Sequence, residues 1–76
     1  MAQSIVEILA EILEVPAESI SDDTSPDTVD AWDSMNNLKM ITAIEQAYDI
    51  QFTMLEIGEM MNVGEIKSML SKKGKL

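Results

Sequence analysis

The sequence predicts an all-α fold, a four-helix bundle with three main helices and one short third helix. Apolar residues recur at helical spacing in several segments, cap residues precede these segments, and no segment alternates as a strand does. The chain has 76 residues, of which 46% are hydrophobic, so it is long enough for one small core. We therefore expect a single domain over residues 1–76.

Three of the expected helix starts carry a capping box, in which a cap residue stands three positions before a glutamate and each side chain bonds the other residue's backbone N–H. The pairs are Ser4 with Glu7, Thr53 with Glu56, and Asn62 with Glu65. They predict a first helix that ends before Pro16, a short third helix over about 54–60, and a fourth helix over about 63–73. The apolar faces of the first and fourth helices are Ile5, Ile8, Leu9, Ile12 and Leu13, and Val63, Ile66, Met69 and Leu70.

The second helix is expected to run from Asp33 or Ser34 to about Tyr48, followed by a short extended connector at 50–52. Its N-cap is either Asp33 or Ser34, and the residue three positions later is asparagine in both cases, so no capping box forms. Its apolar residues suggest a stripe of Met35, Leu38, Ile41, Ile44 and Tyr48.

Residues 16–33 form a stretch of eighteen residues that is rich in Pro, Ser, Asp and Thr. This is longer than an ordinary connection in a compact domain. Two explanations stand side by side: the loop crosses the bundle between two antiparallel helices, or it presents Ser34. Its expected anchors are Ile20, Val29 and Trp32.

The composition argues against catalysis by the chain itself. It contains no histidine and no cysteine, whereas a nucleophilic serine needs a neighbouring base, which is usually histidine. Chemistry at Ser34 would therefore come from a partner enzyme or from an attached group. The alternative is that Ser34, or Asp33, is an ordinary N-cap.

The net charge is −9, and nine of the fourteen acidic residues precede Lys39, the first basic residue. Such a chain repels nucleic acid and anionic lipid and attracts basic protein surfaces or divalent cations; the charge could equally serve solubility alone. The acidic stretch 22–30 does not fit a calcium loop, because Thr28 and Ser34 stand where a frame from Asp23 needs glycine and glutamate. We expect no metal site, no membrane insertion, a cytoplasmic location and a monomer.

Three stretches together match one known family. Asp33-Ser34-Met35 matches its Asp-Ser-Leu, and Val63-Gly64-Glu65-Ile66 matches the Val-Gly-Asp-Leu that opens its last helix. The residues between them that also agree are Leu38, Ile41, Ile44, Glu45, Tyr48, Asp49, Ile50 and Phe52. On these residues the chain resembles the acyl carrier proteins, including the carrier domains of polyketide and nonribosomal peptide synthases.

The resemblance implies a covalent 4′-phosphopantetheine arm on Ser34, transferred from coenzyme A by a phosphopantetheinyl transferase that supplies Mg²⁺. The arm's thiol would hold acyl groups as thioesters for an acyl ligase, acyltransferase or synthase. Recognition by these enzymes is expected at Trp32, Asp33, Met35, Asn36, Lys39 and Glu45. An aminoacyl or peptidyl cargo, or an unmodified acidic helical interaction module, are the alternatives.

The chain departs from fatty-acid carriers at the positions two, five, eleven and twelve residues after the serine. Fatty-acid carriers usually show several acids on this helix, but here only Glu45 is acidic and the others are Asn36, Lys39 and Gln46. Together with Trp32 before Asp-Ser, this indicates a specialised or polyketide-type freestanding carrier.

Methionine is abundant, with six residues besides the first. Flexible thioethers fill irregular core space, and this accounts for them without any ligand. The sharper hypothesis is an interior that admits an acyl chain, lined by Met35, Met40, Met54 and Met60.

Overall fold

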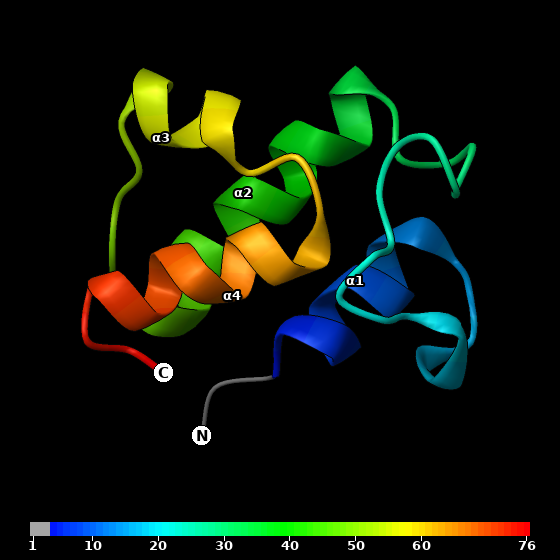
Figure 1. The fold of residues 1–76 in the computed structure, drawn as a ribbon, viewed down its shortest axis with the longest axis horizontal. Helices are drawn as coiled ribbons and strands as arrows, with labels where there is room; N and C mark the ends of the chain where they lie inside the picture. The colour runs from blue at the N-terminus through cyan, green and yellow to red at the C-terminus, as the bar shows by residue number, and fades with distance from the viewer. Residues whose placement is uncertain (1–3) are drawn as a thin grey trace.

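The computed structural model describes residues 4–76 as a small helical bundle (Figure 1). In chain order the elements are α1 (Ile5–Leu13), the 3-10 helix η1 (Ala17–Ser19), α2 (Ser34–Tyr48), α3 (Met54–Glu59) and α4 (Val63–Lys72). No strand occurs within residues 4–76. The all-α fold with a short third helix and a long loop before α2 is confirmed.

Two of the three capping boxes form as predicted. The N–H of Glu7 donates to Ser4 Oγ (3.1 Å) and the N–H of Ser4 donates to Glu7 Oε1 (3.0 Å). The pair Thr53 and Glu56 exchanges the same two bonds at 3.1 and 2.9 Å. These bonds satisfy N–H groups that a helix start would otherwise leave unpaired.

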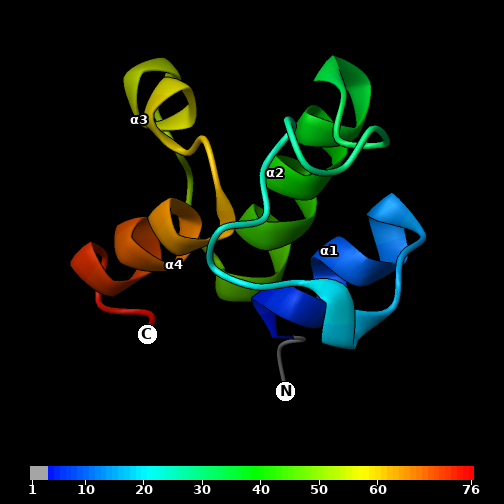
Figure 2. The same cartoon turned by 45° about the vertical axis from the view of Figure 1, so that its right-hand side comes forward.

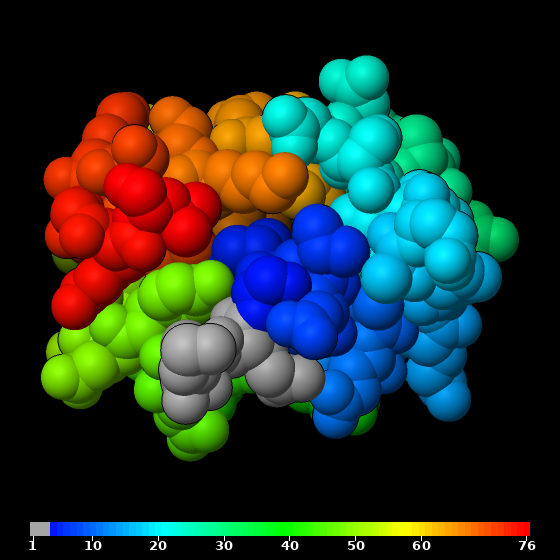
Figure 3. Space-filling model, turned by 90° about the horizontal axis from the view of Figure 1, so that it is seen from below, coloured from blue at the N-terminus to red at the C-terminus, as the bar shows by residue number. Residues whose placement is uncertain are grey.

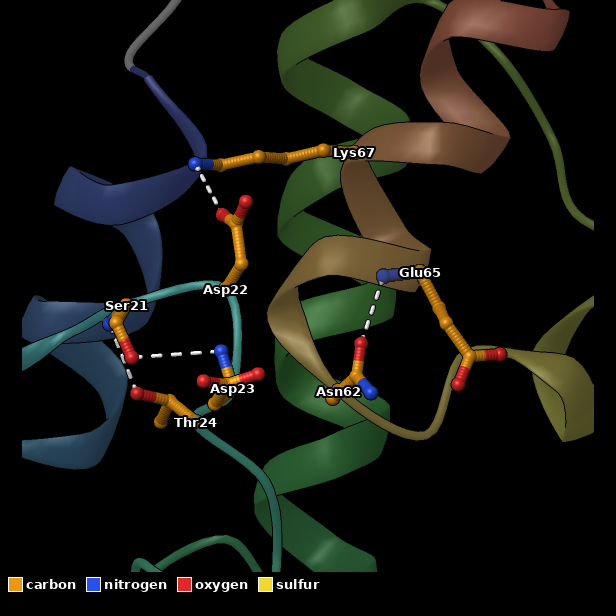
Figure 4. Close-up of polar contacts among 7 residues, drawn as sticks. All are labelled: Ser21, Asp22, Asp23, Thr24, Asn62, Glu65 and Lys67. Atoms are coloured by element: carbon orange, nitrogen blue, oxygen red, sulfur yellow. Dashed lines mark hydrogen bonds and ion pairs between the residues drawn. The ribbon is translucent and has the colours of Figure 1, made fainter.

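The third capping box was predicted wrongly in its second half. Asn62 caps α4, since the N–H of Glu65 donates to its Oδ1 at 2.8 Å. The Glu65 carboxylate turns away from Asn62 (Figure 4) and makes no hydrogen bond to the described residues. The first two N–H groups of α4, those of Val63 and Gly64, are bonded by a distant segment.

That distant segment is the loop before α2. The N–H of Gly64 donates to the carbonyl of Asp22 (2.9 Å), and the N–H of Val63 donates to the carbonyl of Thr24 (3.0 Å). The Lys67 ammonium also pairs with the Asp22 carboxylate at 2.8 Å (Figure 4). The loop therefore crosses from η1 to the start of α4 before it rises to the start of α2 (Figure 2).

Three residues anchor the loop to the bundle, as predicted. Trp32 is buried, and the partly buried Ile20 and Val29 pack against the core. Thr24 was not predicted but is buried as well; its Oγ1 accepts the N–H of Ser21 at 2.9 Å. Burial of these side chains stabilises a segment that has few helical hydrogen bonds of its own.

The core lies between α1, α2 and α4. Its buried apolar residues are Ile5, Ile8, Leu9, Leu13, Trp32, Met40, Ile41, Ile44, Phe52, Met60, Val63, Ile66, Met69 and Leu70. The apolar faces predicted for α1 and α4 are thus confirmed, except that Ile12 is only partly buried. No residue of α3 is buried, so α3 lies at the edge of the core.

The predicted stripe of α2 is wrong at its first two residues. Met35 and Leu38 are 68% and 61% exposed, whereas α2 buries Met40, Ile41 and Ile44. Each residue turns an α-helix by about 100°, so Met35 and Ile44 lie about 180° apart on its surface. A run of three-residue steps drifts around the helix, and α2 consequently has apolar residues on two opposite faces.

The start of α2 and all of α3 lie at one end of the molecule, at the top of Figure 1. The opposite end carries the C-terminal segment and the beginning of α1, which lie side by side when the molecule is seen from below (Figure 3). Among residues 4–76 no helix has the length and apolar character needed to cross a membrane.

Candidate functional site at the start of α2

The cap of α2 is Asp33. Its Oδ1 accepts the N–H of Asn36 at 2.9 Å, and its backbone is extended, as is usual for an N-cap. Ser34 is therefore the first helical residue, and its exposed hydroxyl is not used for capping. The structure thereby decides between the two caps that the sequence allowed.

Two asparagine side chains hold the segment before Ser34 against the first turn of α2. Asn37 Oδ1 accepts the indole N–H of Trp32 at 2.9 Å, and Asn36 Nδ2 donates to the carbonyl of Ala31 at 2.7 Å. Trp32 is only 4% exposed. These bonds hold the backbone on both sides of Ser34, which is itself exposed at the surface.

A cavity of about 350 Å³ opens beside Ser34. Its lining is mostly apolar and comes from the loop, the start of α2, and the end of α3 with the residues that follow: Pro26, Trp32, Asp33, Ser34, Asn37, Ile57, Met60 and Met61. The cavity could accept the apolar part of a group attached to Ser34.

The surroundings of Ser34 contain no general base of the usual kind. The chain has neither histidine nor cysteine, and the adjacent Asp33 carboxylate is engaged by the N–H of Asn36. Among residues 4–76 no three acidic side chains come together in a way that could hold a metal ion. The hydroxyl is accessible to an external enzyme but is not activated from within.

The capping boxes lower the pKa of two carboxyl groups, those of Glu7 and Glu56. The hydrogen bond from the backbone of Ser4 lowers the pKa of Glu7, and that from the backbone of Thr53 lowers the pKa of Glu56. Lys73 lowers the pKa of Glu56 further, through an ion pair of 3.0 Å. These shifts concern helix stability and not the surroundings of Ser34.

Of the six residues predicted for recognition, Trp32 and Asp33 make the bonds at the start of α2 described above. The other four separate into two groups. Met35 and Lys39 are exposed on α2 and free to meet a partner. Asn36 and Glu45 are half-buried and engaged within the chain: Asn36 holds Ala31, and Glu45 Oε2 accepts the N–H of Phe52 at 2.8 Å. Glu45, the one acid at the four positions compared above, therefore fastens the connector after α2.

The methionines predicted to line an acyl site do not lie together. Met60 lines the cavity beside Ser34, whereas Met40 is in the core and Met54 is 86% exposed on α3. Sequence reasoning missed Asn37, Ile57 and Met61 as lining residues. The position of Asn37 one turn after Ser34 was the available signal, since residues three apart share a helix face.

Ser34 is thus an exposed serine at the start of a helix, beside a largely apolar cavity, in a chain that has no histidine or cysteine to activate it. The family model described as "Phosphopantetheine attachment site" matches residues 3–70 of the chain. The chain belongs to this family, whose members carry covalent 4′-phosphopantetheine. No curated protein matches the sequence as a relative.

Proposed function

We propose that this protein is an acyl carrier protein whose phosphopantetheine arm is attached to Ser34 Oγ. The observation that carries the proposal is the exposed hydroxyl that the Asp33 cap leaves unused, in a chain that belongs to an attachment-site family. The resemblance of the residues around Ser34 to the Asp-Ser-Leu of acyl carrier proteins supports the same position.

The surroundings of Ser34 fit such a group. The hydroxyl is open to solvent, and the N–H groups at a helix start together with the helix dipole favour a phosphate. The apolar cavity formed in part by Ile57, Met60 and Met61 offers space next to it. The bound arm would supply a thiol that holds acyl groups as thioesters, which the chain's own residues cannot provide.

The protein itself acts as a carrier and not as an enzyme. A phosphopantetheinyl transferase would modify Ser34, and an acyl ligase, acyltransferase or synthase of fatty-acid, polyketide or related biosynthesis would use the loaded chain as a cytoplasmic monomer. The neutral or basic residues Asn36, Lys39 and Gln46 favour a specialised pathway over general fatty-acid synthesis. An aminoacyl cargo remains the alternative within the carrier class.

Mass spectrometry tests the attachment. Incubation with a promiscuous phosphopantetheinyl transferase, coenzyme A and Mg²⁺ should add one phosphopantetheine to the chain. Ser34→Ala should abolish the addition without loss of helical circular dichroism, because this side chain does not cap α2. Ser68→Ala, at another exposed helical serine, is the matched control and should be modified normally.

Two results would contradict the proposal. Addition at Ser4, Ser25 or Ser68 would place the arm elsewhere. No addition to a folded chain would favour the unmodified interaction module.

A further inference from the structure

The outward face of α2 carries an apolar groove next to Ser34. A depression of about 440 Å³ is lined by Met35, Leu38, Lys39, Thr42, Ala43 and Gln46. Met35 and Leu38 are 68% and 61% exposed and share a side of the helix, because they are three residues apart. Met35 directly follows Ser34, so a molecule seated here would lie beside the attachment position.

The groove also differs from the rest of the molecule in charge. α2 contains one lysine, Lys39, and one glutamate, Glu45, so its net charge is zero and the whole net charge of −9 lies outside it. None of the groove residues is acidic. Among the described residues the ion pairs join Lys67 to Asp22 and Lys73 to Glu56, and Lys39 has no partner.

These charges restrict what can occupy the groove. The net charge of the chain attracts basic surfaces at long range and repels an extended anionic surface such as a lipid membrane. In contact with the groove itself, however, a basic side chain would meet Lys39 at short range, where nearby charges are least screened. A second copy in a two-fold dimer would bring the same patch against itself and place two Lys39 side chains near each other. The occupant that fits is a protein surface with apolar side chains and a carboxylate at the position of Lys39.

We propose that the groove docks a partner enzyme that inserts apolar side chains between Met35 and Leu38 and pairs a carboxylate with Lys39. This inference rests on the proposed function, because docking here would bring the partner's active site to the arm on Ser34. In this contact the carrier supplies the positive charge and the partner the negative one. Carriers that offer acids to basic partners have the opposite arrangement. The groove would gain specificity in two ways: Lys39 would repel basic partners, and it would pair with the carboxylate of the correct one.

Two synthetic helical peptides test the chemistry directly. Both have the same apolar face, and one carries a glutamate where the other carries a lysine. Binding to the full chain at low ionic strength is followed by ¹⁵N–¹H chemical shifts. The glutamate peptide should shift residues along 35–46 and bind about two- to fivefold more tightly than the lysine peptide. The net charge of −9 by itself predicts the opposite order.

Matched variants assign the contact to residues. Lys39→Glu should reverse the order of the two peptides, whereas Lys72→Glu, at an exposed lysine of α4, should not. Leu38→Ser should weaken binding, whereas Met54→Ser should leave it unchanged, because Met54 is exposed outside the groove. Tighter binding of the lysine peptide in all variants would overturn the proposal, as would shifts confined to other elements.

The outcome is independent of the modification at Ser34. The titrations are repeated with Ser34→Ala, in which docking should persist. Docking of the glutamate peptide to a chain that a transferase cannot modify would contradict the carrier function alone. Normal modification without docking would contradict this inference alone. Sedimentation that shows a dimer sensitive to Leu38→Ser would assign the groove to a second copy and also overturn it.

Discussion

The indole N–H of Trp32 donates to Oδ1 of Asn37 across 2.9 Å, which ties the last buried residue of the loop to the first turn of α2. Since Ser34 lies between these two residues in sequence, this bond fixes the backbone that presents the serine. The geometry of the site therefore depends on the side chain of Asn37, which the sequence alone did not indicate as important.

Removal of the acceptor should therefore destabilise the site. Asn37→Ala would leave a buried indole N–H without a partner, and we expect it to lower the free energy of unfolding by about 1–3 kcal/mol. In a Trp32→Phe background the same change should cost clearly less, because no donor remains. Urea denaturation of the four proteins measures the coupling, and equal costs in both backgrounds would show that the bond contributes nothing.

The two helical glycines should respond in different ways to alanine. A Cβ at Gly58 in α3 would meet nothing within 4 Å, so Gly58→Ala should stabilise the protein by about 0.5–1 kcal/mol. A Cβ at Gly64 would lie 3.3 Å from the Asp22 carbonyl oxygen, which already accepts the Gly64 N–H. Gly64→Ala should therefore stabilise the protein less than Gly58→Ala does, or destabilise it. If both variants raised the melting temperature equally, the loop at Asp22 would be able to move away from the added methyl group without a loss of stability.

The capping boxes predict a pH dependence of stability. The pKa of Glu7 is lower in the folded state than its usual value of 4.5, so its ionised form stabilises the fold above that pH. This contribution is lost as the pH falls through the lowered folded value. Glu7→Gln, which can keep the hydrogen bond but does not titrate, should be less stable than wild type at pH 7 and approach it below pH 4.5.

The control for this experiment is Glu59→Gln, at an exposed glutamate of α3 outside the capping boxes. Its stability relative to wild type should change little over the same interval. A constant difference between wild type and Glu7→Gln from pH 7 to pH 3 would contradict the assignment.

Neighbouring acids in the loop should differ in their effect on stability. Asp22 pairs with Lys67 at 2.8 Å, whereas the exposed Asp23 takes part in no such pair with any residue from 4 to 76. At low salt Asp23→Asn should raise the melting temperature slightly, because it relieves repulsion in a chain of net charge −9. Asp22→Asn loses an exposed pair worth about 0–1 kcal/mol and should not.

Melting temperatures measured at different salt and divalent-cation concentrations test the same charge repulsion. Higher ionic strength, or millimolar Mg²⁺, should raise the melting temperature of wild type and reduce the difference between the two variants. Melting midpoints that do not respond to salt, to Mg²⁺ or to either substitution would show that these acids are well solvated and without consequence.

The sequence alone determined the features that depend on residues close in the chain. The bounds of the helices and the caps Ser4 and Thr53 follow from hydrogen bonds and apolar spacing over three or four positions. Such interactions form within one turn of the backbone, so local sequence contains the information.

Only the tertiary structure decided the features that depend on distant segments. The carbonyls of Asp22 and Thr24 bond the first N–H groups of α4, and Glu45 accepts the N–H of Phe52 seven residues later. Asn62 caps α4 without the reciprocal bond from Glu65 that the spacing suggested. The packing of α2 against α1 selected Met40, Ile41 and Ile44 for the core and left Met35 and Leu38 outside. A helix with two apolar faces can bury either one, and the choice belongs to the elements that pack against it.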